Sequence, residues 1–137
     1  MNTSQIKIKA IAATNKETFE NWGGMQKFSN QAITDLADSA VGCAVLFNFN
    51  NEKRIGTVIA AKNDEGSLCI EVSIACPGPA IDWDGQRIVP GFTVEKDECK
   101  EENTSFKREI KKCKAFVFGL IPVETAVEPN LPNLEKL

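Results

Sequence analysis

The sequence predicts an α+β protein with a single domain, built mainly on an antiparallel sheet or small barrel with two or three short helices. A length of 137 residues, with 42% apolar and 26% charged residues, is typical of one soluble domain with a buried core. Three short runs of strand-forming residues follow one another between Cys43 and Cys76. Immediately before them, apolar residues are spaced as on one face of a helix.

The three runs between these cysteines predict an antiparallel meander. Apolar residues alternate with others over 43–49 and 68–74, and a β-branched run occupies 55–61. The connections, 50–53 and 63–66, consist of Asn, Asp, Glu, Lys and Gly, which favour tight turns. Each strand should therefore pair with the next one along the chain.

The N-terminal part predicts a strand and a short helix. Isoleucine alternates with lysine over 6–10, which indicates a strand that ends near Thr14. Apolar residues recur every three positions over 16–27, which indicates a helical face. Because Gly23 and Gly24 interrupt this pattern, we expect a short helix followed by a loop.

A second helix is predicted directly before the meander. Ser29 or Asn30 is a suitable N-cap, since a short polar side chain accepts a hydrogen bond from a free amide of the first turn. The apolar residues that follow form one stripe. They are Ala32, Ile33, Leu36, Ala37 and Ala40.

The chain after the meander is predicted to contain an edge strand. Residues 87–89 and 92–94 resemble short strand pieces. Pro90 and Gly91 separate them, and proline lacks the amide that a sheet ladder requires. We therefore expect an edge strand or a bulge here.

The remaining chain predicts a third helix and then a central strand. An acidic segment, 95–102, precedes Thr104 or Ser105, either of which can cap a short helix that carries the basic residues of 107–112. Residues 115–123 are almost wholly apolar and have the length of a central strand.

We assign residues 1–124 to one β-rich globular domain and residues 125–137 to an extended C-terminal arm or a disordered tail. Pro129 and Pro132 favour an extended chain. Two alternatives remain open, a disordered terminus and an arm that docks on a neighbouring subunit. The apolar residues available for docking are Val127, Leu131, Leu134 and Leu137.

The chain contains no histidine, which limits its chemistry. Ser-His-Asp and Cys-His nucleophilic sites, histidine-based general base catalysis and most zinc sites are excluded. The chain also lacks the glycine spacing of phosphate-binding loops. We predict that the protein is not an enzyme and uses no cofactor.

Asp82 and Asp84 flank Trp83 and precede Gly85, and such a fragment could bind Ca²⁺ or Mg²⁺ through oxygen. The other ligands of a known Ca²⁺ loop are missing, so a solvated turn is the alternative and no metal site is predicted. We instead assign Trp83, Asp84 and the more distant Glu98 to contacts with a protein partner.

A net charge of −3 argues against a general affinity for nucleic acid, which requires a concentrated positive surface. The best nucleic-acid candidate is the basic cluster at Lys107, Arg108, Lys111, Lys112 and Lys114. Nearby acidic residues should weaken its field. A nucleic-acid partner is therefore not expected.

The compartment is inferred from the cysteines and the N-terminus. The five cysteines include no C-x-x-C pair, which favours free thiols. The first residues show no basic and apolar leader, and no apolar run approaches the length of a membrane span. We expect a cytoplasmic protein without membrane contact, in the host cytoplasm or the virion if it is viral.

Several short motifs occur in order along the chain. They are Gln31-x-Ile33-x-x-Leu36-Ala37, Gly42-x-Ala44-Val45, Asn48-Phe49, Ile55-Gly56-x-Val58 and Gly66-x-Leu68. This succession resembles a module of tailed-bacteriophage prohead proteases and related capsid-morphogenesis proteins. The resemblance implies a β-barrel-like, assemblin-related domain with a place in phage head assembly. Those serine proteases use histidine, so it implies a structural or accessory protein rather than an active protease.

Two functions remain open from the sequence. The first is a structural or accessory protein, such as a phage capsid component, that assembles in many copies through sheet edges and the C-terminal arm. The second is a small inhibitor or adaptor that binds a single host or viral protein through acidic surfaces such as 95–102. Both require protein contacts, and the first implies an oligomer.

Overall fold

The computed structural model describes residues 5–20, 24–75, 85–102, 105–125, 131–132 and 134–136. The elements in chain order are β1 (Gln5–Thr14), β2 (Thr18–Phe19), β3 (Met25–Phe28), α1 (Asn30–Ala40), β4 (Ala44–Phe47), β5 (Arg54–Asp64), β6 (Ser67–Ala75), β7 (Gln86–Glu102), β8 (Ser105–Pro122), η2 (Val123–Thr125), a 3-10 turn, and β9 (Glu135–Lys136).

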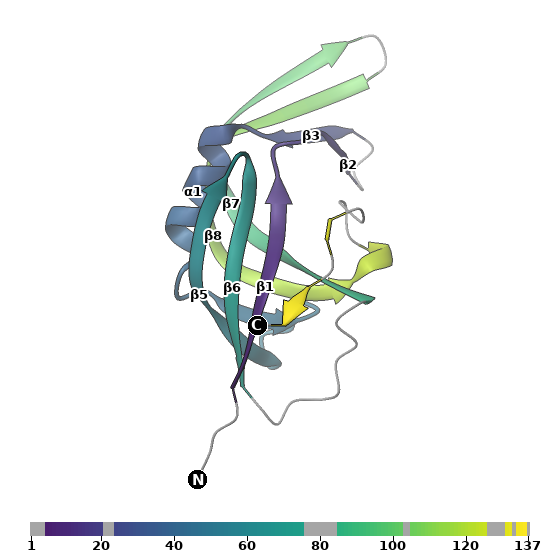
Figure 1. Ribbon diagram of the computed structural model, residues 1–137. Helices are drawn as coiled ribbons and strands as arrows, with labels where there is room; N and C mark the ends of the chain where they lie inside the picture. Colours follow the sequence, from purple (N-terminus) through teal and green to yellow (C-terminus); the bar gives the residue numbers. More distant parts are fainter. Residues whose placement is uncertain are drawn as a thin grey trace.

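The strands form one curled, mixed sheet that resembles half of a barrel (Figure 1). Its order is β2-β3-β8-β4-β5-β6-β1-β9, and β7 pairs with the other edge of β8. The pairs β4/β5, β5/β6, β6/β1 and β7/β8 are antiparallel, whereas β3 and β4 both run parallel to β8. The predicted meander is therefore confirmed as β4, β5 and β6.

β3 and β4 share one edge of β8, and α1 occupies the interval between them. β3 pairs with β8 as far as Ile110, and β4 begins to pair at Phe118. Between these positions, side chains of α1 replace a strand as hydrogen-bond partners. The Asp35 carboxylate accepts from the Cys113 amide at 3.3 Å, and the Ser39 hydroxyl accepts from the Ala115 amide at 2.8 Å. The backbone of β8 is thus satisfied where no strand reaches it.

The helix begins and packs as its sequence indicates. The Ser29 hydroxyl accepts a hydrogen bond from the Ala32 amide at 3.0 Å, which confirms Ser29 as the N-cap. All five residues of the predicted apolar stripe are buried. They join a core that includes Ile8, Val58, Ile70 and Phe118, so the helix is held mainly by apolar burial.

The predicted fold class, with two or three short helices, is wrong, although most strand pairs are antiparallel as expected. The described chain has a single α-helix, is mostly strand, and places two parallel pairs in its sheet. Residues 16–27, predicted as a short helix, contribute β2 and the start of β3 instead. Packing of Phe28 favours the strand over the helix, because its ring lies edge-on against Phe92 of β7. The ring centroids are 5.1 Å apart.

The helix predicted after Thr104 or Ser105 is also absent, because residues 105–122 form one continuous strand, β8. Its lysines, arginine and glutamate have good helix propensity, but pairing with both β3 and β7 overrides a weak local preference. The predicted edge strand is confirmed. β7 pairs with β8 alone among the described strands, and its register shifts between Gly91 and Phe92.

Candidate protein-contact site

The long hairpin of β7 and β8 projects from the body of the molecule, as the green strands at the top of Figure 1 show. We define the β7–β8 ribbon as residues 95–102 of β7 and 105–112 of β8. Within it, Cys99 lies opposite Arg108 and Glu102 lies opposite Ser105. The ribbon is therefore an antiparallel ladder that continues well beyond the strands around the core.

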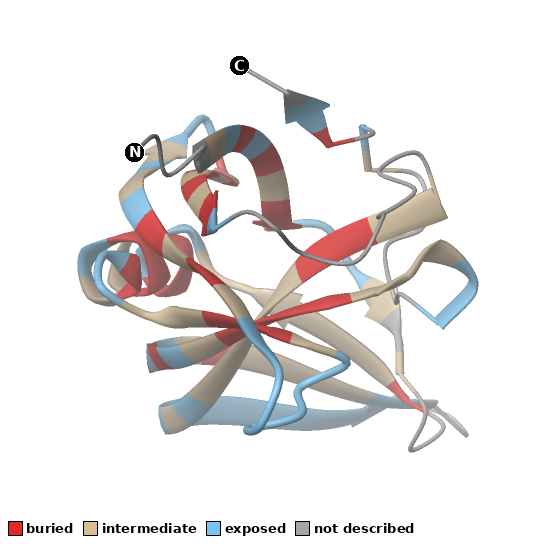
Figure 2. Cartoon of the chain, turned by 90° about the horizontal axis from the view of Figure 1, so that it is seen from below, coloured by how far each residue is buried: buried red, intermediate tan, exposed pale blue. Residues whose placement is uncertain are grey.

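The β7 half of the ribbon is open to solvent on both faces. Every side chain from Glu95 to Glu101 is exposed, without the alternation that one-sided packing produces (Figure 2). Since β7 pairs only with β8 among the described strands, its outer edge is also unpaired. An isolated two-stranded ribbon is marginally stable in water. This segment thus presents backbone and side chains without contributing buried surface of its own.

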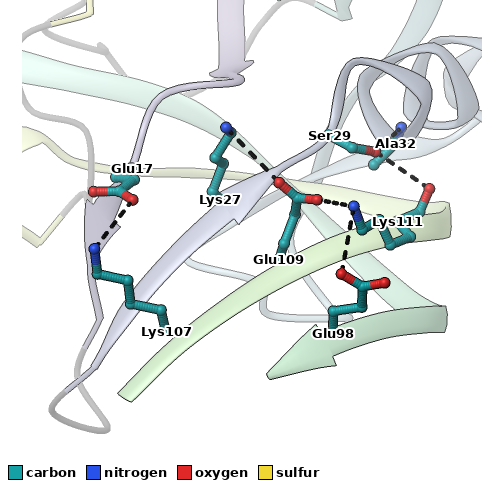
Figure 3. Close-up of polar contacts among 8 residues, drawn as sticks. All are labelled: Glu17, Lys27, Ser29, Ala32, Glu98, Lys107, Glu109 and Lys111. Carbon is teal, nitrogen blue, oxygen red and sulfur yellow. Dashed lines mark hydrogen bonds and ion pairs between the residues drawn. The ribbon is translucent and has the colours of Figure 1, made fainter. Parts of the chain in front are cut away.

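Cross-strand charges hold the first face of the ribbon together (Figure 3). Glu98 and Glu109 lie directly opposite one another, an arrangement that is unfavourable by itself. Lys111 resolves it, because its ammonium contacts Glu109 and lies 3.7 Å from Glu98. Lys27 of β3 adds a second cation 3.7 Å from Glu109. The hydrogen bond from Lys111 lowers the pKa of Glu109, and the same bond raises the pKa of Lys111.

Besides the main-chain pairing of β3 with residues 107–110 of β8, two exposed ion pairs connect the ribbon to the body. One is the contact of Lys27 with Glu109, and the other joins Lys107 to Glu17 at 3.9 Å. Both pairs border a charged groove of about 230 Å³ on this face. Exposed ion pairs of this kind contribute little stability each, so they set the direction of the ribbon more than they fix it.

The second face carries one strong ion pair. The Arg108 guanidinium donates from Nε to Asp97 at 2.7 Å, a charge-assisted hydrogen bond. Phe106 is 39% exposed on the same strand near the end of the ribbon. A charged strand that ends in an exposed aromatic ring offers both polar and apolar contacts to a partner.

The whole ribbon is electrically balanced, because positions 95–112 hold six acidic and six basic residues. Lys111 and Arg108, two members of the predicted basic cluster, are paired with acids of β7. Lys112 lies 3.8 Å from Glu95 in the same manner. The cluster therefore does not form the continuous positive surface that binding to a phosphate backbone requires. A protein surface of mixed charge is a better match.

The structure separates the residues that we predicted as a contact site. Glu98 lies in the ribbon and pairs with Lys111. Leu131 lines a cavity beside β1, and Leu134 is 7% exposed within the core next to β9, which pairs with β1. Four further predictions lie outside the described residues. They concern Trp83 and Asp84, with the cation fragment that includes Asp82, and the C-terminal Val127 and Leu137.

Sequence reasoning named 95–102 as a possible acidic contact surface but did not predict that it forms a two-stranded ribbon with 105–112. The available signal was the mixed charge of 95–112, which we interpreted as a solvated acidic segment followed by a basic helix. A lysine or arginine of β8 that pairs with an acid of the neighbouring strand β7 cannot be recognised before the pairing register is known.

In the part of the chain that the structure describes, the thiols, the clustered acidic side chains and the helix provide no metal-binding or membrane-spanning site. The described cysteines, Cys43, Cys69, Cys99 and Cys113, are all free thiols. In the described ranges, no cluster of three or more acidic or cysteine side chains is placed to hold a metal ion. No helix within those ranges is long and apolar enough to cross a bilayer.

Comparison with known proteins adds no relative. No protein-family model, no curated protein and no solved structure matches this chain.

Proposed function

We propose that this chain is a non-enzymatic structural protein that binds other protein subunits and assembles in multiple copies, with the β7–β8 ribbon as its contact element. The observation that carries the proposal is the β7 half of the ribbon, which is exposed on both faces and has an outer edge that no described strand pairs with. Such an edge can accept another strand or lie across a second subunit. The setting that we propose is a bacteriophage head, a choice that rests on the resemblance to prohead-protease-like proteins.

The charges of the ribbon support selective rather than indiscriminate contacts. Lys96, Lys100 and Glu101 are exposed along the open strand, and charged edge strands resist uncontrolled edge-to-edge association. A partner must therefore present charges in the complementary order, which provides specificity. Assembly in a defined geometry requires this property.

The alternative function is an inhibitor or adaptor that binds one host or viral protein through an acidic surface. We place it second because Glu95, Asp97 and Glu98 each have a basic partner on β8. These pairs reduce the negative potential that an acidic mimic needs.

A shortened ribbon tests the proposal. Replacing residues 101–106 with Asn-Gly keeps Lys100 opposite Lys107 and closes the strands with a favoured two-residue turn. We expect light scattering to show multimers for the unmodified chain and a monomer for the shortened chain, with unchanged circular dichroism. The matched control is Glu65→Asn, which places the same Asn-Gly turn between β5 and β6, where Glu65 and Gly66 already have positive φ.

The two functions give different results in this experiment. Multimers that persist after shortening would show that the end of the ribbon, residues 101–106, is not the contact. A monomeric unmodified chain that co-purifies with one protein at a fixed ratio would replace assembly with the inhibitor function.

A further inference from the structure

The structure contains a second candidate site, a cavity of about 270 Å³ beside β1, β3 and β7. Its walls are mostly apolar and include the rings of Phe28, Phe49 and Phe92. An apolar cavity of about 150 Å³ is already large enough to hold a benzene molecule. The volume here therefore suits a small ligand with one ring or a short aliphatic body.

Phe49 forms its wall at an energetic cost. Asn48 and Phe49 have φ of 51° and 56°, and the Asn50 amide donates to the Phe47 carbonyl at 3.0 Å, as in a type I′ turn. Glycine normally occupies the second of these positions, and a bulky residue there is strained. The ring lies on Gly119, where any β-carbon would overlap it. The fold thus maintains an aromatic wall in an unfavourable backbone conformation.

Among the described residues that line this apolar cavity, Glu20 is the one that carries a charge. Its Oε1 atom accepts from the Thr18 hydroxyl at 2.9 Å and from the Gln26 side-chain amide at 3.3 Å. Among the described residues, nothing donates to Oε2 and no lysine or arginine pairs with this carboxylate. The Glu20 side chain is half-buried. A carboxylate in such a place favours a cationic ligand.

We propose that this cavity binds a small organic amine, with its apolar body between the phenylalanine rings and its protonated nitrogen on Glu20. The rings add to the attraction, because a cation near an aromatic face is stabilised by the ring's quadrupole. Thr18 and Gln26 hold the carboxylate in position, which leaves Oε2 free for the ligand. This site is separate from the β7–β8 ribbon and does not depend on the proposed assembly.

Phenethylamine is the probe that tests this site. Its matched controls are 2-phenylethanol, a neutral compound of the same shape, and 3-phenylpropionate, an anion with a similar body. We expect saturable nuclear magnetic resonance shifts at the amides of Ala12 and Ala13 with phenethylamine, and weaker binding of both controls. Equal binding of the anion, or no saturation with the amine, would overturn the proposal.

Two variants place the ligand in the cavity. Glu20→Gln keeps the size and hydrogen bonding of the side chain, and we expect it to weaken phenethylamine binding at least about tenfold, the order expected for losing a hydrogen bond to a charged group. It should leave 2-phenylethanol binding unchanged. Phe92→Leu removes an aromatic face and should weaken the amine more than the alcohol. Glu52→Gln, an exposed acid in another turn, is the control. Unchanged amine binding in Glu20→Gln would contradict the assignment.

Discussion

Cys113 shows how a single buried group links this fold to pH. Burial, together with the smaller effects of the Asp35 and Glu95 carboxylates, raises the pKa of its thiol from an ordinary 9.0 to about 12. The thiol donates to the Ala32 carbonyl at 3.5 Å beneath α1. The native state therefore favours the protonated form, and the thiol is a weak nucleophile at neutral pH.

The pH dependence of stability follows from this shift. Above about pH 9 the unfolded chain releases the Cys113 proton while the folded chain retains it, so the free energy of unfolding falls between about pH 9 and 12. Below pH 9 this contribution is complete and constant. We expect urea midpoints to decline more steeply from pH 8 to 10.5 in the unmodified chain than in Cys113→Ala. Urea midpoints that decline equally steeply in the two proteins would contradict the burial of this thiol.

Gly119 tests the aromatic wall of the cavity. A methyl group at this position would overlap the Phe49 ring, so we expect Gly119→Ala to lower the free energy of unfolding by about 1–3 kcal/mol. The measurement is urea denaturation of four proteins, the unmodified chain, each single variant and the double variant with Phe49→Ala. Removing the ring should relieve most of the clash in the double variant. If the losses in the free energy of unfolding of the two single variants simply add in the double variant, the Phe49 ring does not lie on Gly119.

At the scale of elements, α1 takes the place of a neighbouring strand along part of β8, because its side chains accept hydrogen bonds from β8 amides. Its N-cap residue serves both elements, since the Ser29 hydroxyl accepts from the Ala32 amide and donates to the Lys111 carbonyl at 3.3 Å. The helix therefore stabilises the sheet through its polar side chains as well as its apolar stripe.

Ser29→Ala removes both of these bonds. We expect a loss of about 1–2 kcal/mol in the free energy of unfolding, at the upper end of measured N-cap effects. Circular dichroism during urea denaturation measures it. The comparison is Gln31→Ala, an exposed residue of the same turn that contacts only Asp35. If both variants lose the same small free energy of unfolding, the hydrogen bonds of Ser29 contribute no measurable stability.

The elements that could be predicted from sequence are those with one buried face. Val45, Val58 and Val72 are buried members of the three meander strands, and Leu36 belongs to the buried helical stripe. The spacing of their apolar residues predicts which face of each element packs against the core. The β7–β8 ribbon has no such period, because Glu95 to Glu101 are all exposed. Its register is that of β7 on β8, which shifts at three places along the strands, and no local sequence pattern contains it.

The candidate site was predictable only in part for the same reason. Glu98 was assigned to protein contact and lies in the ribbon, but its pairing with Lys111 depends on that register. Glu20 was not singled out at all. Its importance comes from the apolar residues that surround it, contributed by β1, β7, β8 and Leu131.

At the scale of the whole molecule, the core and the projecting ribbon have separate tasks. Helix α1 and the curled sheet bury the apolar residues, β7 carries the chain from this core into the solvent-exposed ribbon, and β8 returns it to the core (Figure 1). A ribbon that is balanced in charge and open along one edge is suited to contact between protein subunits.

Hydrogen–deuterium exchange of the β7 amides over 93–102 tests this claim most directly. Measured at a low concentration and at one where light scattering reports multimers, exchange in this segment should slow on assembly. Exchange at the turn between β5 and β6 should stay the same, since that turn lies outside the proposed contact. Multimers whose β7 amides exchange as fast as in the dilute protein, or the absence of multimers at every concentration, would contradict the account.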